Sequence, residues 1–178
     1  MRIISGIHKG RKLSPPKKLP VRPTTDRSKE ALFNILQHQL DWEHIAVLDL
    51  FSGTGSISYE FGSRGVKAIH AVDQNRMCVD YIKKTATTLE LPIEVTQIEV
   101  LKFLSVVKTK FDLIFADPPY DMSLDQYSEI IATVFSKKLV GETGILIIEH
   151  STHLSLDEHP YFSHSRKYGS NVFSFFKR

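Results

Sequence analysis

Short apolar runs alternate along the chain with stretches whose apolar side chains recur at helical spacing. The runs of strand length fall at residues 46–50, 68–72, 93–97, 113–116 and 144–149. The stretches with helical spacing begin at Thr25 or Asp26 and recur at residues 57–64, 75–89, 100–107 and 124–135. Strands that alternate with helices in this way indicate an α/β protein with a mostly parallel sheet.

The C-terminal part has a different pattern, that of an antiparallel hairpin. Two predicted strands, residues 161–168 and 172–176, flank the turn signal Gly169-Ser170-Asn171. We therefore expect the sheet to be parallel with an antiparallel edge. No internal repeat and no second catalytic domain is visible, so residues 25–178 are predicted to form one compact unit.

A glycine-containing loop follows the first predicted strand, in the sequence Phe51-Ser52-Gly53-Thr54-Gly55. Gly53 and Gly55 allow the backbone to turn sharply and to approach a ligand closely. The next strand ends in Asp73, where an acidic side chain is placed to bind ribose hydroxyls. The third glycine of the dinucleotide fingerprint is replaced by Ser58, and Asp49 before the loop would repel a pyrophosphate. The pattern favours a ligand with a ribose but no phosphate, such as S-adenosylmethionine.

The run at 113–116 leads into the most informative motif of the chain, Asp117-Pro118-Pro119-Tyr120. Each proline restricts φ and lacks an N–H, so the turn is stiff and its carbonyls remain free to accept hydrogen bonds. Asp117 and the Pro118 carbonyl are suited to accept both hydrogens of one planar NH2 group, while Tyr120 stacks on the ring that carries it. This arrangement predicts methylation of an exocyclic base nitrogen, with Asp117, Pro118 and Tyr120 as the catalytic residues.

Length and composition are those of a single enzyme domain. The chain has 178 residues, 42% of them hydrophobic, which is enough for one sizeable core. No apolar run approaches the roughly 20 residues that a membrane-spanning helix needs, and the N-terminus has no signal-peptide pattern. A single cysteine, Cys78, excludes an internal disulfide and a cysteine-cluster metal site, and the histidines show no metal-ligand spacing. We expect a cytoplasmic monomer without a metal.

The net charge of +3 conceals a strongly basic N-terminal segment. Residues 1–29 carry nine Lys or Arg and one Asp, a net charge of +8, whereas the rest of the chain has a net charge of −5. Residues 2–13 are predicted to form a hairpin and the prolines that follow an extended connector, so residues 1–24 are separated from the catalytic unit. A basic segment on an acidic body is expected to contact a polyanion, although a solvated leader would have the same composition.

Together these motifs resemble the RsmD family of bacterial 16S rRNA (guanine-N2)-methyltransferases over nearly the whole chain. The resemblance rests on four segments of this sequence, Arg2–Leu13, Arg22–Asn34, Asp49–Gly55 and Asp117–Tyr120. The segment Arg22-Pro23-Thr24-Thr25-Asp26-Arg27 is specific to the family, whereas the last two segments occur in many methyltransferases. The resemblance implies a Rossmann-like class I methyltransferase fold with seven strands. It also implies S-adenosyl-L-methionine as the donor and a loop guanine of 16S rRNA, in the assembled small ribosomal subunit, as the acceptor.

The resemblance also assigns roles to individual residues. The residues expected to bind the cofactor are Thr25, Asp49, Phe51, Ser52, Gly53, Gly55, Asp73, Gln74, Glu99 and Val100. The residues expected to bind RNA are Arg2, Lys9, Arg11, Lys12, Arg22 and Arg27. Two positions depart from the family pattern. Glu99-Val100 stands where Asp or Asn and a small residue are frequent, and His8 stands where a larger aromatic or basic residue is frequent.

Three other functions remain open from the sequence. A DNA or RNA adenine-N6 methyltransferase shares the Asp-Pro-Pro-Tyr motif, but such DNA enzymes usually carry a separate target-recognition domain. A protein-glutamine methyltransferase would have Asn rather than Asp at position 117. A non-catalytic RNA-binding module would use the basic segment but would leave the acidic side chain at Asp73 without a role.

Overall fold

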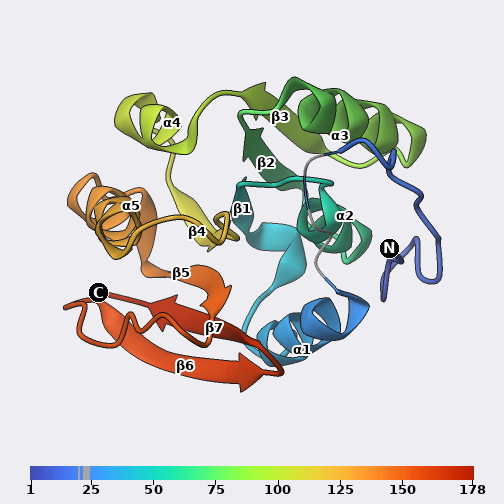
Figure 1. Ribbon diagram of the computed structural model, residues 1–178. Helices are drawn as coiled ribbons and strands as arrows, with labels where there is room; N and C mark the ends of the chain where they lie inside the picture. The colour runs from blue at the N-terminus through green and yellow to red at the C-terminus, as the bar shows by residue number, and fades with distance from the viewer. Residues whose placement is uncertain (20, 22–24) are drawn as a thin grey trace.

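Figure 1 shows the computed structural model of the protein, which describes residues 1–19, 21 and 25–178. Its strands are β1 (Ala46–Leu50), β2 (Ala68–Asp73), β3 (Ile93–Gln97), β4 (Phe111–Ala116), β5 (Val140–Ser151), β6 (Phe162–Tyr168) and β7 (Asn171–Phe176). Its helices are α1 (Asp26–Leu36), the 3-10 helix η1 (Trp42–His44), α2 (Ser56–Ser63), α3 (Arg76–Thr88), α4 (Val100–Val106) and α5 (Leu124–Ser136).

The strands form one sheet in the order β3-β2-β1-β4-β5-β7-β6. The five strands from β3 to β5 are parallel, and β7 pairs antiparallel with both β5 and β6. This confirms the α/β class, the parallel sheet and the antiparallel C-terminal hairpin. The strand order reverses between β1 and β4, and open α/β sheets bind their ligands beyond the carboxyl ends of the strands at such a reversal.

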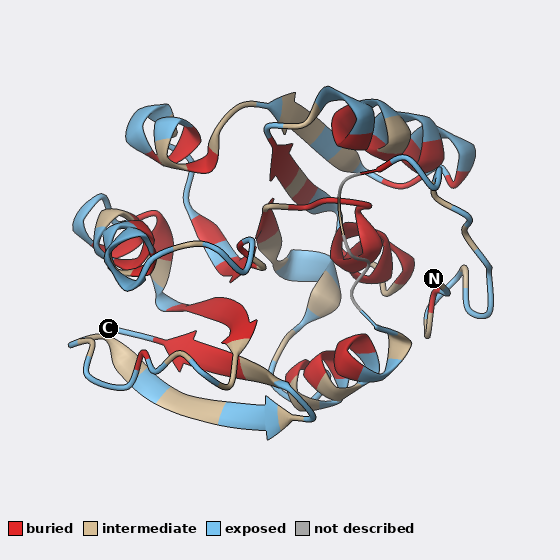
Figure 2. Ribbon diagram, viewed as in Figure 1, coloured by how far each residue is buried: buried red, intermediate tan, exposed pale blue. Residues whose placement is uncertain are grey.

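Helices cover both faces of the sheet (Figure 1). Helices α4 and α5 pack on one face, in a core that includes Leu104, Ile130 and Ile148. Helices α1 and α2 pack on the other face, in a core that includes Phe33 and Ile147, and α3 joins a smaller cluster beside them. Neighbouring residues of β5 thus belong to opposite layers, as the pleat of a strand requires. Buried residues are concentrated in the inner strands and on the inward helix faces (Figure 2).

The basic segment at the N-terminus forms the predicted hairpin and is docked on the catalytic body. Residues Arg2 and Lys12 form an antiparallel bridge, and the Ile3 N–H donates to the Arg11 carbonyl at 3.0 Å. Ile3 is buried in the cluster beside α3. Gly6 lies so close to α2 that an added Cβ would come within 1.7 Å of the Ser63 carbonyl oxygen. The division of the chain at residue 24 stays a prediction.

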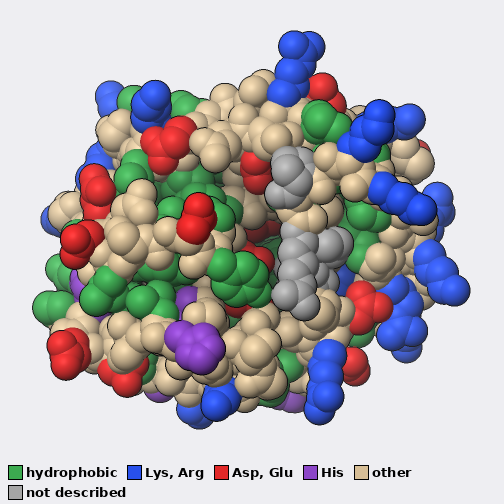
Figure 3. All heavy atoms as spheres, viewed as in Figure 1, with side chains coloured by type: hydrophobic (Ala, Val, Ile, Leu, Met, Phe, Trp, Pro, Cys, Tyr) green, Lys and Arg blue, Asp and Glu red, His purple; other side chains and the backbone are tan. Residues whose placement is uncertain are grey.

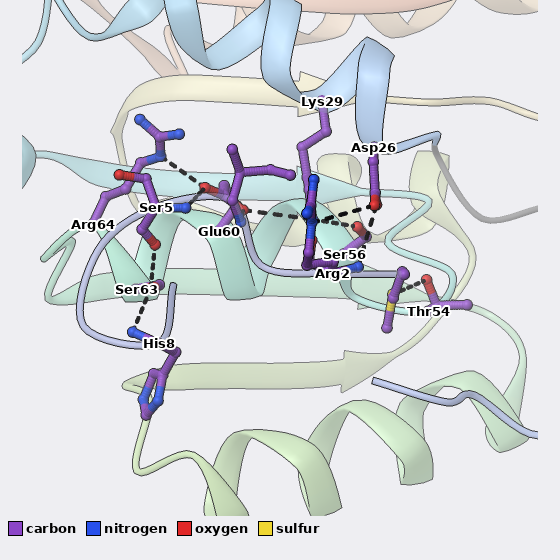
Figure 4. A network of polar contacts seen from close by, with 12 residues as sticks. Arg2, Ser5, His8, Asp26, Lys29, Thr54, Ser56, Glu60, Ser63 and Arg64 are labelled. Carbon is purple, nitrogen blue, oxygen red and sulfur yellow. Dashed lines mark hydrogen bonds and ion pairs between the residues drawn. The ribbon is translucent and has the colours of Figure 1, made fainter. Parts of the chain in front are cut away.

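A buried ionic network holds this hairpin to α1 and α2 (Figure 4). Glu60 of α2 lies 3.5 Å from the Lys29 ammonium and 2.9 Å from Arg64 Nε, and it also accepts the N–H groups of Ile4 and Ser5. Lys29 donates to the Arg2 carbonyl at 2.6 Å. Lys29, which contributes to the charge of +8, is therefore an internal cation and is not available to a polyanion.

The predicted boundaries agree with the structure to within a few residues except in β5. That strand extends from Val140 to Ser151, well beyond the predicted 144–149, because its ends pair with Phe111 and Asn171, which are distant in the sequence. Of the two residues at which the first helix is expected to begin, Thr25 caps α1, since its hydroxyl accepts the Ser28 N–H at 3.1 Å. Within the described ranges, no helix has the length and apolar character to cross a membrane.

Candidate active site

Four acidic side chains lie at the carboxyl ends of four adjacent strands. They are Asp73 of β2, Asp49 of β1, Asp117 after β4 and Glu149 of β5. Side chains of a strand alternate between the two faces of a sheet. Each acid is two or four positions after a residue of its strand that packs under α1 and α2, so all four acids project from that face. The register places Asp73, Asp117 and Glu149 at one level and Asp49 two residues, about 7 Å, deeper.

These residues line a cleft of about 1290 Å³ at the point where the strand order reverses. Figure 3 shows the hollow in the middle of this face, with acidic side chains inside it and Lys and Arg side chains gathered on the side where Figure 1 places the N-terminal hairpin. The charge asymmetry predicted from the sequence is therefore also a separation in space. Across the described part of the chain, no three His, Cys, Asp or Glu side chains are grouped so as to hold a metal ion.

The glycine-containing loop between β1 and α2 forms one wall of the cleft. Gly53 and Gly55 both have positive φ, +52° and +78°. A Cβ at Gly55 would come within 2.9 Å of Tyr59 and Ile82, so the loop can pack on α2 and α3 only without a side chain there. Gly53 is itself buried, but it borders the cleft, and the nearest atom to such a Cβ there is 3.7 Å away. The loop thus brings its backbone to the cleft with no side chain at Gly53.

Asp73 holds this loop to the next helix. One carboxylate oxygen accepts the Gly53 N–H at 2.8 Å, and the other accepts the Asn75 N–H at 2.8 Å, just before α3. Asp73 is 8% exposed and borders the cleft. Each oxygen retains a second lone pair, so the carboxylate remains able to accept hydrogen bonds from ribose hydroxyls.

Asp49 is the deepest of the four acids. It accepts a hydrogen bond from the Ser58 hydroxyl of α2, and this contact ties β1 to the start of the helix after the glycine loop. Burial raises the pKa of Asp49 to about 7. The Ser58 contact lets Asp49 order the segment that follows β1, and its predicted contact with the cofactor stays a prediction.

The Asp-Pro-Pro-Tyr segment forms the opposite wall. Burial, together with the nearby charges of Glu149 and Asp49, raises the pKa of Asp117 well above its usual range. Pro118 is buried beneath the cleft, whereas the Tyr120 ring is 67% exposed. An acid and an exposed aromatic ring therefore lie together at the cleft, and their catalytic roles stay a prediction.

The structure brings most of the predicted cofactor residues into one cleft. Those that border it are Thr25, Asp49, Phe51, Ser52, Gly53, Asp73, Gln74, Glu99 and Val100. Gly55 belongs to the same loop but does not border the cleft, and its left-handed backbone shapes the loop. Glu99 also caps α4, since its carboxylate accepts the N–H groups of Leu101 and Lys102.

The predicted RNA-binding residues do not form one group. Arg27 borders the main cleft, Arg2 and Lys9 border a separate hollow of about 350 Å³ between the hairpin and α1, and Arg11 and Lys12 are exposed on the hairpin. Arg22 lies outside the described residues.

Sequence reasoning missed two parts of the cleft, Glu149 and the turn between β6 and β7. The turn residues Lys167 to Asn171 close the cleft on the side of β5. An acid at the end of an otherwise apolar strand was a signal for Glu149. No comparable signal marked the turn, because only the antiparallel return of β7 beside β5 brings it to the site.

Comparison with known proteins identifies the family. The family model described as "Conserved hypothetical protein 95" matches residues 1–177. The Ribosomal RNA small subunit methyltransferase D of Haemophilus influenzae is 34% identical over 129 residues, which cover 70% of this chain and 66% of that protein. The chain belongs to the RsmD family. Another relative, the provisionally named rRNA methyltransferase YlbH of Bacillus subtilis, is 33% identical over 89% of this chain and 86% of its own length.

Solved structures confirm the class I methyltransferase fold of this RsmD-family protein. A provisionally named methyltransferase of Escherichia coli, YhhF, superposes with a TM-score of 0.85 at 26% identity, over 100% of this chain and 97% of that one. The 16S rRNA N2 G1207 methyltransferase RsmC of Thermus thermophilus, solved with AdoMet and guanosine, has a TM-score of 0.71 at 20% identity. That match covers 87% of this chain and 44% of RsmC, and it concerns the fold alone.

Proposed function

We propose that this protein transfers a methyl group from S-adenosyl-L-methionine to the exocyclic N2 of a loop guanine in 16S rRNA, in the assembled small ribosomal subunit. Membership of the RsmD family supports the coarser activity, S-adenosylmethionine-dependent methylation of rRNA. The observation that carries the finer proposal is one shared cleft. It joins the glycine loop after β1 to the Asp-Pro-Pro-Tyr segment after β4. Such an enzyme would act in the cytoplasm as a monomer.

The residues of the cleft fit this cofactor. Gly53 borders the cleft without a side chain and so accommodates a close ligand, and Asp73 has free lone pairs for ribose hydroxyls. The Asp73 carboxylate, which accepts the N–H of Gly53 in the glycine loop, disfavours a phosphate there but favours a cation, so a sulfonium suits the site better than a dinucleotide does. When bound, S-adenosylmethionine supplies a methyl group on a sulfonium, from which a neutral thioether departs as the N2–methyl bond forms. The N2 nitrogen then loses one proton, to Asp117 or to water. Gln74, Glu99 and Val100 border the part of the cleft near β2 and β3 and would contact the adenine.

The other wall would hold and orient the target base. Guanine N2 is a poor nucleophile because its lone pair is delocalised into the ring. Hydrogen bonds from the NH2 group to Asp117 and to the Pro118 carbonyl favour a pyramidal nitrogen whose lone pair points at the methyl group. Tyr120 is exposed and free to stack on the base, an interaction worth about 1–3 kcal/mol. The protein would thus act mainly through position and electrostatics.

RNA would approach over the basic side of the molecule rather than through the acidic cleft. Arg2, Lys9, Arg11 and Lys12 lie on the hairpin, and Arg27 lies at the edge of the cleft. We propose that they bind phosphates around a base that is splayed out of its stack. Replacing Arg11 and Lys12 by Ala is expected to weaken RNA binding. The slope of log K against log salt should also fall by about 0.7–0.9 for each phosphate that the variant no longer neutralises.

The test uses labelled S-adenosylmethionine with small subunits from cells that lack this protein, followed by nucleoside digestion and mass analysis. N2-methylguanosine at one site supports the proposal. N6-methyladenosine would keep the cofactor but contradict the acceptor, and label in protein would point to a glutamine acceptor. If the protein binds the cofactor but transfers no label to RNA, DNA or protein, the proposed substrate is incorrect. Asp117→Ala should abolish transfer and leave cofactor affinity nearly unchanged; loss of both would contradict the role of Asp117.

A further inference from the structure

Glu149 is a buried carboxylate that the proposed mechanism does not use. It is 4% exposed and borders the cleft. Oε1 accepts a hydrogen bond from the side-chain amide of Asn171 at the start of β7. Oε2 has no hydrogen-bond partner among the described residues. A buried acceptor without a donor is unfavourable, so this oxygen is suited to a donor that a ligand brings.

The sheet places Glu149 beside Asp117. Ala116 of β4 and Ile148 of β5 are register partners, so the residues that follow them, Asp117 and Glu149, lie at one level on one face. Neighbouring strands are about 4.8 Å apart. Because the two carboxyl groups are close, the charge of Glu149 adds to the effect of burial and raises the pKa of Asp117 further. The cleft therefore places two carboxyl groups side by side, and each keeps an acceptor oxygen even where the pair holds a proton.

Guanine carries two neighbouring donors that match this pair. On its Watson–Crick edge the N1–H lies next to the N2 amino group. Adenine has an amino group next to N1 as well, but its N1 has no hydrogen and is an acceptor. When the amino group lies at Asp117, a second carboxylate beside it would face the N1–H donor of guanine, whereas in adenine it would face the lone pair of N1. A flipped base is read through hydrogen bonds to this edge.

We propose that Glu149 is a specificity-determining residue whose Oε2 accepts the N1–H of the target guanine while Asp117 accepts from N2. This inference rests on the proposed function, since it assumes that the base enters the cleft with its amino group at Asp117. It explains how a motif shared with adenine-N6 methyltransferases selects guanine. The two carboxylates come from adjacent strands, so the spacing of the acceptors is set by the sheet and not by a loop.

The test compares guanine with 2-aminopurine at the methylated position of reconstituted small subunits. 2-Aminopurine keeps the C2 amino group but has an acceptor at N1 and no oxygen at C6. The wild-type protein is expected to prefer guanine by about 10- to 100-fold in kcat/KM, because a buried acceptor is otherwise left unpaired. Equal rates on the two bases would overturn the proposal without any variant.

The Glu149→Gln variant distinguishes recognition of the base by Glu149 from a purely structural role of this residue. The Gln side chain still accepts the Asn171 amide through its oxygen, and its NH2 group suits an acceptor at N1. The rate on guanine should fall about 10- to 100-fold, the preference over 2-aminopurine should nearly disappear, and cofactor affinity should stay within about twofold. Glu142→Gln, the same change at an exposed position of β5, should alter none of these.

The outcomes distinguish this proposal from the function on which it rests. If wild-type protein forms no N2-methylguanosine, the proposed function fails. If N2-methylguanosine forms but Glu149→Gln lowers the rates on both bases equally, Glu149 only holds β7 in place. In that case the proposed function stands and the specificity role is refuted.

Discussion

Glu60 is the side chain on which docking of the N-terminal hairpin most depends. It is fully buried in α2 and accepts the N–H groups of Ile4 and Ser5 at 2.8 and 3.0 Å. It also lies 2.9 Å from Arg64 Nε and 3.5 Å from Lys29 Nζ. Glu60→Gln preserves the size of the side chain, removes its charge, and points an NH2 group at a site that contains only donors.

The expected loss of stability is large because the charges that remain are buried. Lys29 is 1% exposed, and burial lowers its pKa more than the charge of Glu60 raises it. Without Glu60 this ammonium loses its ion-pair partner among the described residues, and only the more distant charge of Asp26 remains near it. Removing one partner of a buried pair typically costs about 3–5 kcal/mol, and we expect Glu60→Gln to lie in that range.

Urea denaturation measures this loss. With an m-value of about 2 kcal/mol/M, the midpoint should fall by about 1.5–2.5 M. The matched control is Glu43→Gln. Glu43 makes the same 2.9 Å contact to Lys67, but both side chains are more than 60% exposed, so the midpoint of this variant should stay close to that of the wild type. Similar midpoints for the two variants would refute the argument from burial.

The opposite substitution should be milder. Lys29→Met removes the buried ammonium and its hydrogen bond to Arg2, yet it leaves Glu60 with Arg64 and two backbone donors. We expect it to cost about 1–2 kcal/mol. A loss as large as that of Glu60→Gln would show that the cation, and not the carboxylate, is the centre of the network.

Three further perturbations test the cleft. Burial raises the pKa of Asp49 from 3.8 to about 7, so the folded state loses stability as the pH rises from about 4 to about 7. Asp49→Asn cannot titrate, so urea denaturation should show that it lacks the loss of about 4 kcal/mol that the wild type undergoes between pH 4 and pH 8, and equal pH profiles would contradict this. Gly55→Ala should weaken cofactor binding in calorimetry by at least about 10-fold, because loss of glycine at this crowded left-handed position displaces the loop. Gly10→Ala is its control, since φ is similar, +82°, and the space around it is open, so unchanged affinity in both would contradict the packing argument. Tyr120→Ala should raise KM for RNA about 10-fold at constant cofactor affinity, and an unchanged KM would exclude stacking.

The sequence alone determined the elements, the fold class and the two motifs of the cleft. These depend on local patterns: apolar periodicity, the two glycines of the loop, and the stiff turn at Asp117. Such patterns follow from backbone sterics and from the need to bury one face of an element, so they can be read without tertiary information. The extent of β5 could not be read in this way, because its ends are set by pairing with distant strands.

Only the tertiary structure decided which charges act together. Lys29 belongs by sequence to the basic segment, but packing of α1 on α2 makes it an internal cation beside Glu60. Glu149 belongs by sequence to an apolar strand, but the parallel register of β4 and β5 places it beside Asp117. The physical reason is that charge interactions depend on distance and burial, and both are established only when strands far apart in the chain pair.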